Sequence, residues 1–172
     1  MTLYNDLNLT QIANNLGQAL TERCLMLVSA ESCTGGWIGQ TVTGIAGSST
    51  WYERGFITYS NLSKQEMLGV SKQTLDRYGA VSEQIAKEMA AGAICRSHAQ
   101  IGMSVTGIAG PDGATEAKPL GMVCFGWAVK DGLACSEVYY LKGDRESIRR
   151  QAVAIALQGA IDLLHDIPVA IV

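Results

Sequence analysis

Apolar residues recur along this chain with two spacings, one typical of helices and one typical of buried strands. Across residues 9–23 they fall every three or four positions, as on a helix with one apolar face. Residues 25–30 and 101–105 are instead short, mostly apolar segments, which are typical of strands buried on both faces. We therefore expect a helix over the first segment and a strand over each of the other two.

The same reasoning covers the rest of the chain. Asn61, Ser71 and Ser82 are expected to cap helices that follow them, and Gly69 is expected to end the first of these. Further helices are expected at residues 37–42, 61–68, 71–78, 82–97 and 143–164. Further strands are expected at residues 51–59, 122–129 and 137–141.

Helices and strands alternate in this order, which favours an α/β fold with a sheet covered on both faces. The last two strands are joined by a turn containing Asp131-Gly132, a sequence typical of antiparallel hairpins. The expected sheet is therefore mixed, although mostly parallel. No linker or low-complexity segment interrupts the chain, so we expect a single domain over residues 1–172.

The composition narrows the classes of function. Apolar residues make up 48% of the chain and charged residues 17%, which indicates a globular protein. The net charge of −3 and the lack of any Lys/Arg run argue against nucleic acid as a partner. No apolar segment approaches the ~20 residues of a membrane span, and the N-terminal residues do not resemble a signal peptide. The expected location is therefore the cytoplasm, with no membrane partner.

Cysteine and histidine usage excludes several kinds of site. The five cysteines are odd in number and none are paired at C-x-x-C spacing, so we expect neither a disulfide framework nor a zinc site. The two histidines, His98 and His165, lie near the ends of expected helices and far from the glycine-bearing turns. This placement disfavours a Ser-His catalytic pair.

The turn after the first strand concentrates reactive side chains. Ser32, Cys33 and Thr34 precede Gly35 and Gly36 at a point where a strand turns into a helix. Such a turn places its residues at the edge of a sheet, and glycine allows another molecule to approach the backbone closely. A helix cap with a tight turn explains the same residues, so a structural and a functional interpretation both stand at this point.

Two nucleophiles compete within this turn. Ser32 needs a base, and Lys64 is the candidate, provided that burial keeps its amine neutral. Cys33 is the rival, because thiolates at helix N-termini have lowered pKa values. Glu31 either orients Lys64 or caps the following helix. Arg145, at the start of the last helix, either grips a phosphate or pairs with neighbouring carboxylates at the surface.

Several motifs taken together resemble the CinA carboxy-terminal domain family, over residues 8–165. Their order along the chain makes the resemblance specific. The motifs are Ala30-Glu31-Ser32-Cys33-Thr34-Gly35-Gly36, Gly47-Ser48-Ser49, Thr58-Tyr59-Ser60-Asn61 with Lys64, Gly79-Ala80-Val81-Ser82, Thr106-Gly107-Ile108-Ala109-Gly110-Pro111 with Lys118-Pro119, and Gly143-Asp144-Arg145.

The resemblance implies a three-layer α/β/α fold and the activity of a nicotinamide-nucleotide amidase. This enzyme hydrolyses the amide of nicotinamide mononucleotide to nicotinate mononucleotide and ammonia, which recycles pyridine nucleotide towards NAD. It implies no metal or cofactor, Ser32 as nucleophile, Lys64 as base and Tyr59 as a positioning or polarising group. The expected substrate-binding residues are Thr34, Gly35, Gly36, Ser48, Asn61, Thr106, Gly107, Gly110 and Arg145.

The chain also departs from the family pattern. Ala114 stands where a second glycine is common after Gly113, and the large amino-terminal domain of fused members is missing, which suggests a stand-alone form. Some paralogues have no demonstrated activity, so the alternatives are a nucleotide-binding or protein-interaction module and a hydrolase that uses Cys33. Trp51, Tyr52 and residues 167–172 belong either to an interface or to the core. We expect a homo-oligomer, with a dimer as the first hypothesis.

Overall fold

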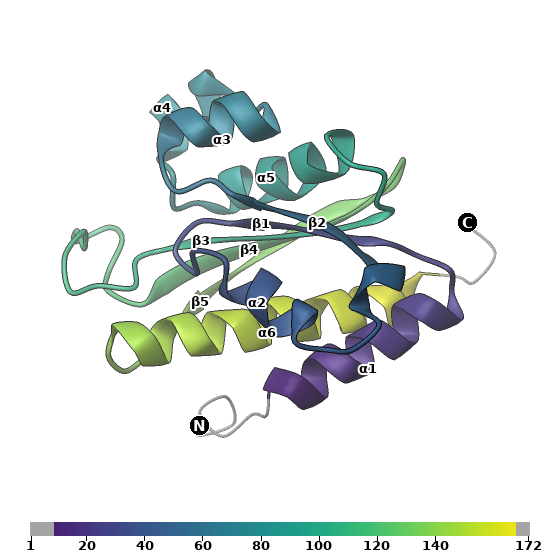
Figure 1. Ribbon diagram of the computed structural model, residues 1–172. Helices are drawn as coiled ribbons and strands as arrows, with labels where there is room; N and C mark the ends of the chain where they lie inside the picture. The colour runs from purple at the N-terminus through teal and green to yellow at the C-terminus, as the bar shows by residue number, and fades with distance from the viewer. Residues whose placement is uncertain (1–8, 168–172) are drawn as a thin grey trace.

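A mixed sheet lies between two layers of helices (Figure 1). The computed structural model describes residues 9–167. In these residues the strands have the order β2-β1-β3-β4-β5. The first three are mutually parallel, and β4 pairs antiparallel with both β3 and β5, so that four of these five strands share one direction. The strands are β1 (Leu27–Glu31), β2 (Tyr52–Ile57), β3 (Ile101–Gly107), β4 (Met122–Val129) and β5 (Ala134–Tyr140).

The helices divide between the two faces of the sheet. In Figure 1, α1, α2 and α6 lie on one face, while α5 lies on the other with α3 and α4 outside it. This arrangement confirms the expected α/β/α layers and the mixed sheet. The helices are α1 (Leu9–Glu22), α2 (Trp37–Thr43), α3 (Asn61–Leu68), α4 (Lys72–Tyr78), α5 (Glu83–Cys95) and α6 (Arg145–Asp166), with a short 3₁₀ turn η1 (Ser48–Thr50) before β2.

Most boundaries agree with the expectations from the sequence, including the caps at Ser71 and Ser82. The expected cap at Asn61 is wrong by one residue. The hydroxyl of Ser60 accepts a hydrogen bond from the Ser63 amide, and the Ser63 hydroxyl accepts one from the Ser60 amide. This reciprocal capping box makes Asn61 the first helical residue.

The side chain of Trp51 lies in the core. It is 3% exposed and packs so closely on α1 that a Cβ atom at Gly17 would lie 2.7 Å from its indole. The neighbouring Tyr52 hydroxyl lies 2.8 Å from the Ser29 hydroxyl inside the sheet edge. Core packing therefore accounts for both aromatic residues. Residues 168–172, the rest of the segment weighed as an interface, lie outside the described residues.

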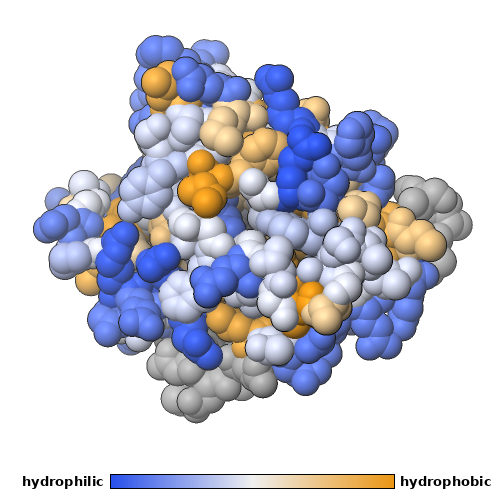
Figure 2. Space-filling view, viewed as in Figure 1, coloured by the Kyte–Doolittle hydropathy of each residue, from blue (hydrophilic) through white to orange (hydrophobic). Residues whose placement is uncertain are grey.

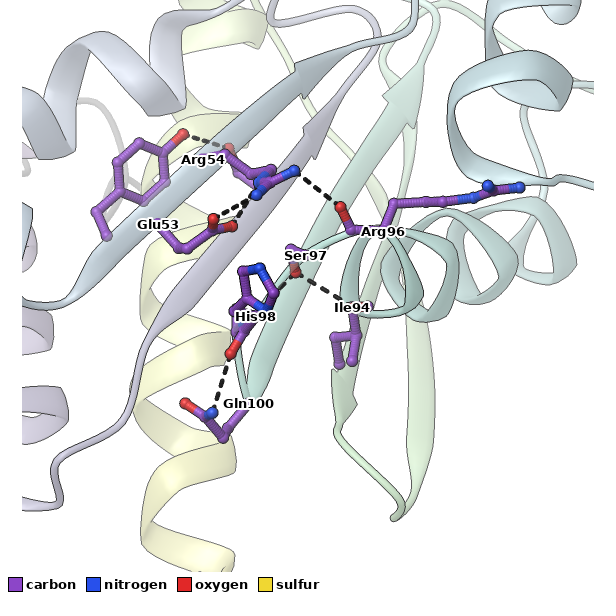
Figure 3. Close-up of polar contacts among 10 residues, drawn as sticks. Glu53, Arg54, Ile94, Arg96, Ser97, His98 and Gln100 are labelled. Carbon is purple, nitrogen blue, oxygen red and sulfur yellow. Dashed lines mark hydrogen bonds and ion pairs between the residues drawn. The ribbon is translucent and has the colours of Figure 1, made fainter.

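Strand β2 is one edge of the sheet, and a polar network ties its middle to the connection between α5 and β3. Arg54 pairs with Glu53 and donates a hydrogen bond to the carbonyl oxygen of Arg96 (Figure 3). His98 lies in this same connection, where β3 begins. Ser32 follows the carboxyl end of β1, whereas His98 precedes the amino end of the parallel strand β3. The two residues therefore lie at opposite ends of the strands.

Hydrophobic and hydrophilic areas alternate on the face shown in Figure 2, with small orange areas separated by white and blue. Ile57 and Leu62 are among the exposed apolar side chains, at 52% and 60% exposure. Among the described residues, no helix is both long enough and apolar enough to cross a membrane.

Candidate active site

The site begins at the elbow between β1 and α2. The Ser32 amide donates a hydrogen bond to the Val105 carbonyl oxygen, which keeps the elbow attached to β3 after β1 has ended. Gly35 and Gly36 then take φ angles of 62° and 102°, which are strained for residues with a Cβ atom. The backbone can therefore reverse within four residues, and Ser32 remains at the carboxyl edge of the sheet.

Helix α3 carries Lys64 to this serine. The Nζ atom of Lys64 donates hydrogen bonds to the Ser32 hydroxyl oxygen at 3.0 Å and to the Thr58 carbonyl oxygen at 2.7 Å. Lys64 is only 1% exposed, although lysine is among the residues most often found in water. The structure thus brings together the two residues that the sequence suggested as nucleophile and base.

Burial changes the protonation of Lys64. Removal from water disfavours its charged form and lowers its pKa from 10.5 to about 8. Among the described residues, no carboxylate forms an ion pair with this amine. A substantial fraction of Lys64 is therefore neutral at mildly alkaline pH and able to accept a proton from Ser32.

Thr58, whose carbonyl oxygen accepts a hydrogen bond from Lys64, also has a side-chain hydroxyl. The Thr58 amide donates to the Glu31 carbonyl oxygen, which continues the pairing of β2 with β1 by one residue. Its Oγ1 atom is buried and has no hydrogen-bond partner among the described residues. Buried hydroxyls are usually satisfied, so an unsatisfied one beside a candidate base is available to a ligand.

Glu31 does not contact Lys64, and the structure places it as a cap for α2. Its carboxylate accepts one hydrogen bond from the Thr34 hydroxyl, at 2.7 Å. It also accepts hydrogen bonds from the amides of Gly36, Ile38 and Gly39, at 2.9 to 3.0 Å. The carboxylate therefore uses the donors that open α2 and holds the elbow rigid.

Two amides of the elbow remain unused. The Gly35 amide donates to the Ser32 carbonyl oxygen, and the Trp37 amide donates to the Thr34 carbonyl oxygen. Among the described residues, no backbone carbonyl accepts a hydrogen bond from the amide of Cys33 or of Thr34. Adjacent unpaired amides beside a nucleophile are what an oxyanion hole requires, because charge develops there only in the transition state.

The thiol of Cys33 is unsuited to be the nucleophile. Its side chain is 7% exposed, and burial raises its pKa from 9.0 to about 12. The thiol therefore stays protonated at physiological pH, whereas nucleophilic attack requires the thiolate.

Arg145 links three segments at the rim of the site. Its guanidinium donates to the Gly110 carbonyl oxygen at 2.6 Å and to the Tyr59 hydroxyl at 3.2 Å. Tyr59 is 62% exposed, and its hydroxyl accepts its hydrogen bond from Arg145 and not from Ser32 or Lys64. The loop after β3, the segment after β2 and the start of α6 are therefore joined around one cation.

An open pocket of about 510 Å³ lies beside the elbow. Gly35, Gly36, Arg145 and Arg149 are among its lining residues. Its size is within the usual range for small-molecule sites. Two guanidinium groups and exposed glycine backbone suit an anionic ligand. In the sequence, Arg149 was visible only as a residue one helical turn after Arg145.

Other expected substrate-binding residues have different surroundings. The hydroxyls of Thr34 and Thr106 are buried and donate to Glu31 and to the Ala80 carbonyl oxygen. Gly107 ends β3, where a Cβ atom would lie 2.8 Å from Val123. Thr34, Thr106 and Gly107 therefore make contacts within the protein that hold the backbone around the site. Their contact with a substrate stays a prediction.

Ser48 and Asn61 are expected substrate-binding residues that lie outside the elbow, in η1 and at the start of α3. Ser48 opens η1, which precedes β2 and so lies at the opposite end of that strand from Thr58. Asn61 is exposed at the start of α3. Within this chain the structure does not bring Ser48 to Ser32, because the length of β2 separates them.

The described residues contain no group of three or more His, Cys, Asp or Glu side chains arranged to hold a metal ion. The elbow itself presents the Ser32 hydroxyl, the Lys64 amine and backbone amides.

Comparison with known proteins agrees with this architecture. Residues 9–164 match the model of the CinA C-terminal domain. The chain is 49% identical over 153 residues to the nicotinamide-nucleotide amidohydrolase PncC of Escherichia coli K12, covering 89% of this chain and 93% of that protein. It is 42% identical over 156 residues to the PncC of Pseudomonas putida, covering 90% and 96%.

A solved structure shows the same fold. The crystal structure of the competence/damage inducible protein CihA from Agrobacterium tumefaciens superposes with a TM-score of 0.88 at 41% identity. The match covers 95% of this chain and 99% of that one.

Proposed function

Because this chain belongs to the CinA C-terminal domain family, we propose that it is a nicotinamide-nucleotide amidohydrolase with a Ser-Lys mechanism. It would convert nicotinamide mononucleotide and water to nicotinate mononucleotide and ammonia. The names of the relatives in Escherichia coli and Pseudomonas putida support the reaction, at 49% and 42% identity over most of both chains.

The observation that carries the mechanism is the contact of Lys64 with Ser32. The 3.0 Å distance between Nζ and Oγ allows direct proton transfer, and burial lowers the pKa of the amine towards 8. A protonated surface lysine could not act as a base at neutral pH. The same contact therefore supplies both the geometry and the protonation state.

In the first step, neutral Lys64 takes the proton of Ser32 as the hydroxyl oxygen attacks the amide carbon. The carbonyl oxygen becomes an oxyanion, which the unpaired amides of Cys33 and Thr34 stabilise. Removal of one such donor typically reduces the rate by ~10²–10³-fold. Glu31 contributes by fixing the elbow, since its carboxylate holds the amides that follow.

In the second step, protonated Lys64 gives its proton to the departing nitrogen, and ammonia leaves. The acyl group is then bound to Ser32 as an ester. Lys64, neutral again, takes a proton from water as the water attacks that ester. It then returns this proton to the Ser32 oxygen as nicotinate mononucleotide leaves. The unpartnered hydroxyl of Thr58 is a polar group available to hold this water or the substrate amide.

The phosphate of the nucleotide is assigned to the pocket beside the elbow. Arg145 opens α6 there and still has donor atoms beyond those that bind Gly110 and Tyr59. A guanidinium binds phosphate through paired, charge-assisted hydrogen bonds. In this assignment Tyr59 acts by positioning Arg145.

The substrate class can be tested by measuring ammonia release from three amides. We expect hydrolysis of nicotinamide mononucleotide, much slower hydrolysis of nicotinamide riboside, and none of free nicotinamide. Equal rates on all three would contradict a role for the phosphate, and tight calorimetric binding of the nucleotide without turnover would favour a binding module. The cytoplasmic location and the homo-oligomer stay predictions. Light scattering would measure the oligomeric state.

A further inference from the structure

Arg149 grips the backbone of the nucleophile elbow. This residue lies in the second turn of α6, and its Nε and Nη2 atoms donate hydrogen bonds to the carbonyl oxygens of Cys33 at 3.0 Å and Thr34 at 2.7 Å. The guanidinium also lies 5.2 Å from the centre of the Trp37 ring. These contacts link α6 to the two residues that follow Ser32.

The first of these contacts controls the direction of an amide. The Cys33 carbonyl and the Thr34 amide belong to one peptide unit, and among the described residues the only cis bond is Gly110–Pro111. In a planar trans peptide the C=O and N–H groups point in opposite directions. Because Arg149 holds the carbonyl towards α6, the Thr34 N–H must point away from α6.

That direction is the one from which the base approaches. Lys64 comes from α3, which lies on the face of the sheet opposite α6 (Figure 1), and it meets the Ser32 hydroxyl oxygen. The Thr34 amide thus points to the side of the elbow where attack takes place. Arg149 also polarises this peptide, since a charged donor on a carbonyl makes the attached amide a better donor.

We infer that Arg149 is a positioning residue that orients and polarises the Thr34 amide of the oxyanion hole. The inference rests on the proposed function, which it deepens. A buried amide without a partner is unfavourable, so its direction has to be imposed by the surrounding structure. The hydrogen bonds of Arg149 to Cys33 and Thr34, with its contact to Trp37, impose it.

Arg149 also lines the pocket, so the competing role is that of a phosphate ligand. The two roles predict different kinetics. A phosphate ligand binds the ground state and the transition state alike, so its loss raises KM. A residue that prepares the oxyanion hole acts on the transition state, so its loss lowers kcat. Only the second role affects a substrate that has no phosphate.

The test compares the wild type with Arg149→Lys and Arg149→Met on nicotinamide mononucleotide and on p-nitrophenyl acetate. Ser32→Ala provides the background for the ester, and Arg77→Lys, at an exposed arginine of α4, provides the matched control. We expect kcat on the nucleotide to fall by on the order of 10²-fold, as for loss of one oxyanion donor. The rate of ester hydrolysis should fall by a similar factor, and KM for the nucleotide should change less than about threefold. In a third variant, Arg149→Ala, added guanidinium should partly restore the rate.

Circular dichroism and thermal unfolding show whether each variant is folded, and guanidinium rescue shows that any loss comes from the missing group. An unchanged ester rate with a raised KM for the nucleotide would overturn the inference in favour of phosphate binding. Wild-type protein that hydrolyses the ester through Ser32 but not the nucleotide would refute the proposed function alone, and the ester arm would still decide on Arg149. Wild-type protein that hydrolyses neither would overturn both.

Discussion

The amine of Lys64 lies 3.0 Å from the hydroxyl oxygen of Ser32, although 32 positions separate them in the chain. The sheet explains the distance. Strands β1 and β2 are parallel neighbours, so the turn after β1 and the segment after β2 reach the same edge. Helix α3 starts in that segment and carries Lys64 back over the edge, where the amine is buried against the Thr58 carbonyl.

The rate of hydrolysis should rise with pH through the pKa of Lys64. Below about pH 8 this amine is protonated and cannot accept a proton from Ser32, and above it the neutral form dominates. We therefore expect kcat to increase about tenfold per pH unit below 7 and to level off above 8.5. The measurement is a pH–rate profile of the wild type, with Lys72→Met as the control because Lys72 is exposed and paired with Asp76. A rate that is constant from about pH 6 to about pH 9 would show that Lys64 is not the base.

Replacement of Lys64 by methionine should stabilise the fold while it removes activity. Folding lowers the pKa of Lys64 from 10.5 to about 8. Between these two pH values the unfolded chain therefore binds more protons than the folded protein. Below that window the folded state bears the full cost of the buried charge, about 3 kcal/mol at 1.4 kcal/mol per pKa unit. Lost hydrogen bonds to Ser32 and Thr58 offset part of it.

The measurement for this prediction is denaturant unfolding of the wild type and Lys64→Met. We expect the variant to be more stable by about 1–3 kcal/mol at pH 7. The advantage should shrink as the pH rises through the window, because the wild type then loses the proton that burial disfavours. A variant that is less stable than the wild type at pH 7, by a margin independent of pH, would contradict this assignment.

Cys33→Ala should retain activity. The thiol is buried with a pKa raised to about 12, and in the proposed mechanism only the backbone amide of Cys33 takes part. We expect kcat/KM within about threefold of the wild type, with some loss of stability from the smaller side chain. An inactive but folded Cys33→Ala protein, together with inactivation of the wild type by a thiol reagent at Cys33, would favour the cysteine mechanism.

Arg145→Gln should weaken binding of the nucleotide more than it slows chemistry. A charge-assisted hydrogen bond contributes about 1.5–3 kcal/mol, so KM for nicotinamide mononucleotide should rise by roughly 10- to 100-fold. Nicotinamide riboside has no phosphate, so its kcat/KM should change little in the same variant. Equal losses on both substrates would place the effect in the anchoring of Tyr59 and the Gly110 loop.

Much of this architecture follows from local patterns in the sequence. The spacing of apolar residues predicts α1 and the buried strands, and the serines at 71 and 82 mark the starts of α4 and α5. The choice between Ser60 and Asn61 as a cap was beyond such reasoning. Both residues can cap a helix, and only the reciprocal bonds with Ser63 distinguish them.

The site was predictable in its reactive residues and not in its supporting contacts. The position of Ser32 at a strand-to-helix turn made it and Lys64 candidates only, and the resemblance to the CinA carboxy-terminal domain family singled them out as nucleophile and base. The roles of Glu31 and Arg149 depend on side-chain directions that spacing does not reveal. Glu31 points to the start of α2 instead of to Lys64, and Arg149 reaches the elbow across more than 110 positions. Long-range contacts of this kind arise only when the helices pack on the sheet.

Ammonia release from nicotinamide mononucleotide by the wild type, Ser32→Ala and Lys64→Met tests the pairing of serine and lysine most directly, with Lys72→Met as the matched control. We predict that the wild type and Lys72→Met release ammonia at similar rates. The Ser32 and Lys64 variants, shown to be folded by circular dichroism, should lose at least ~10³-fold in kcat. Full activity in either folded variant would contradict the mechanism.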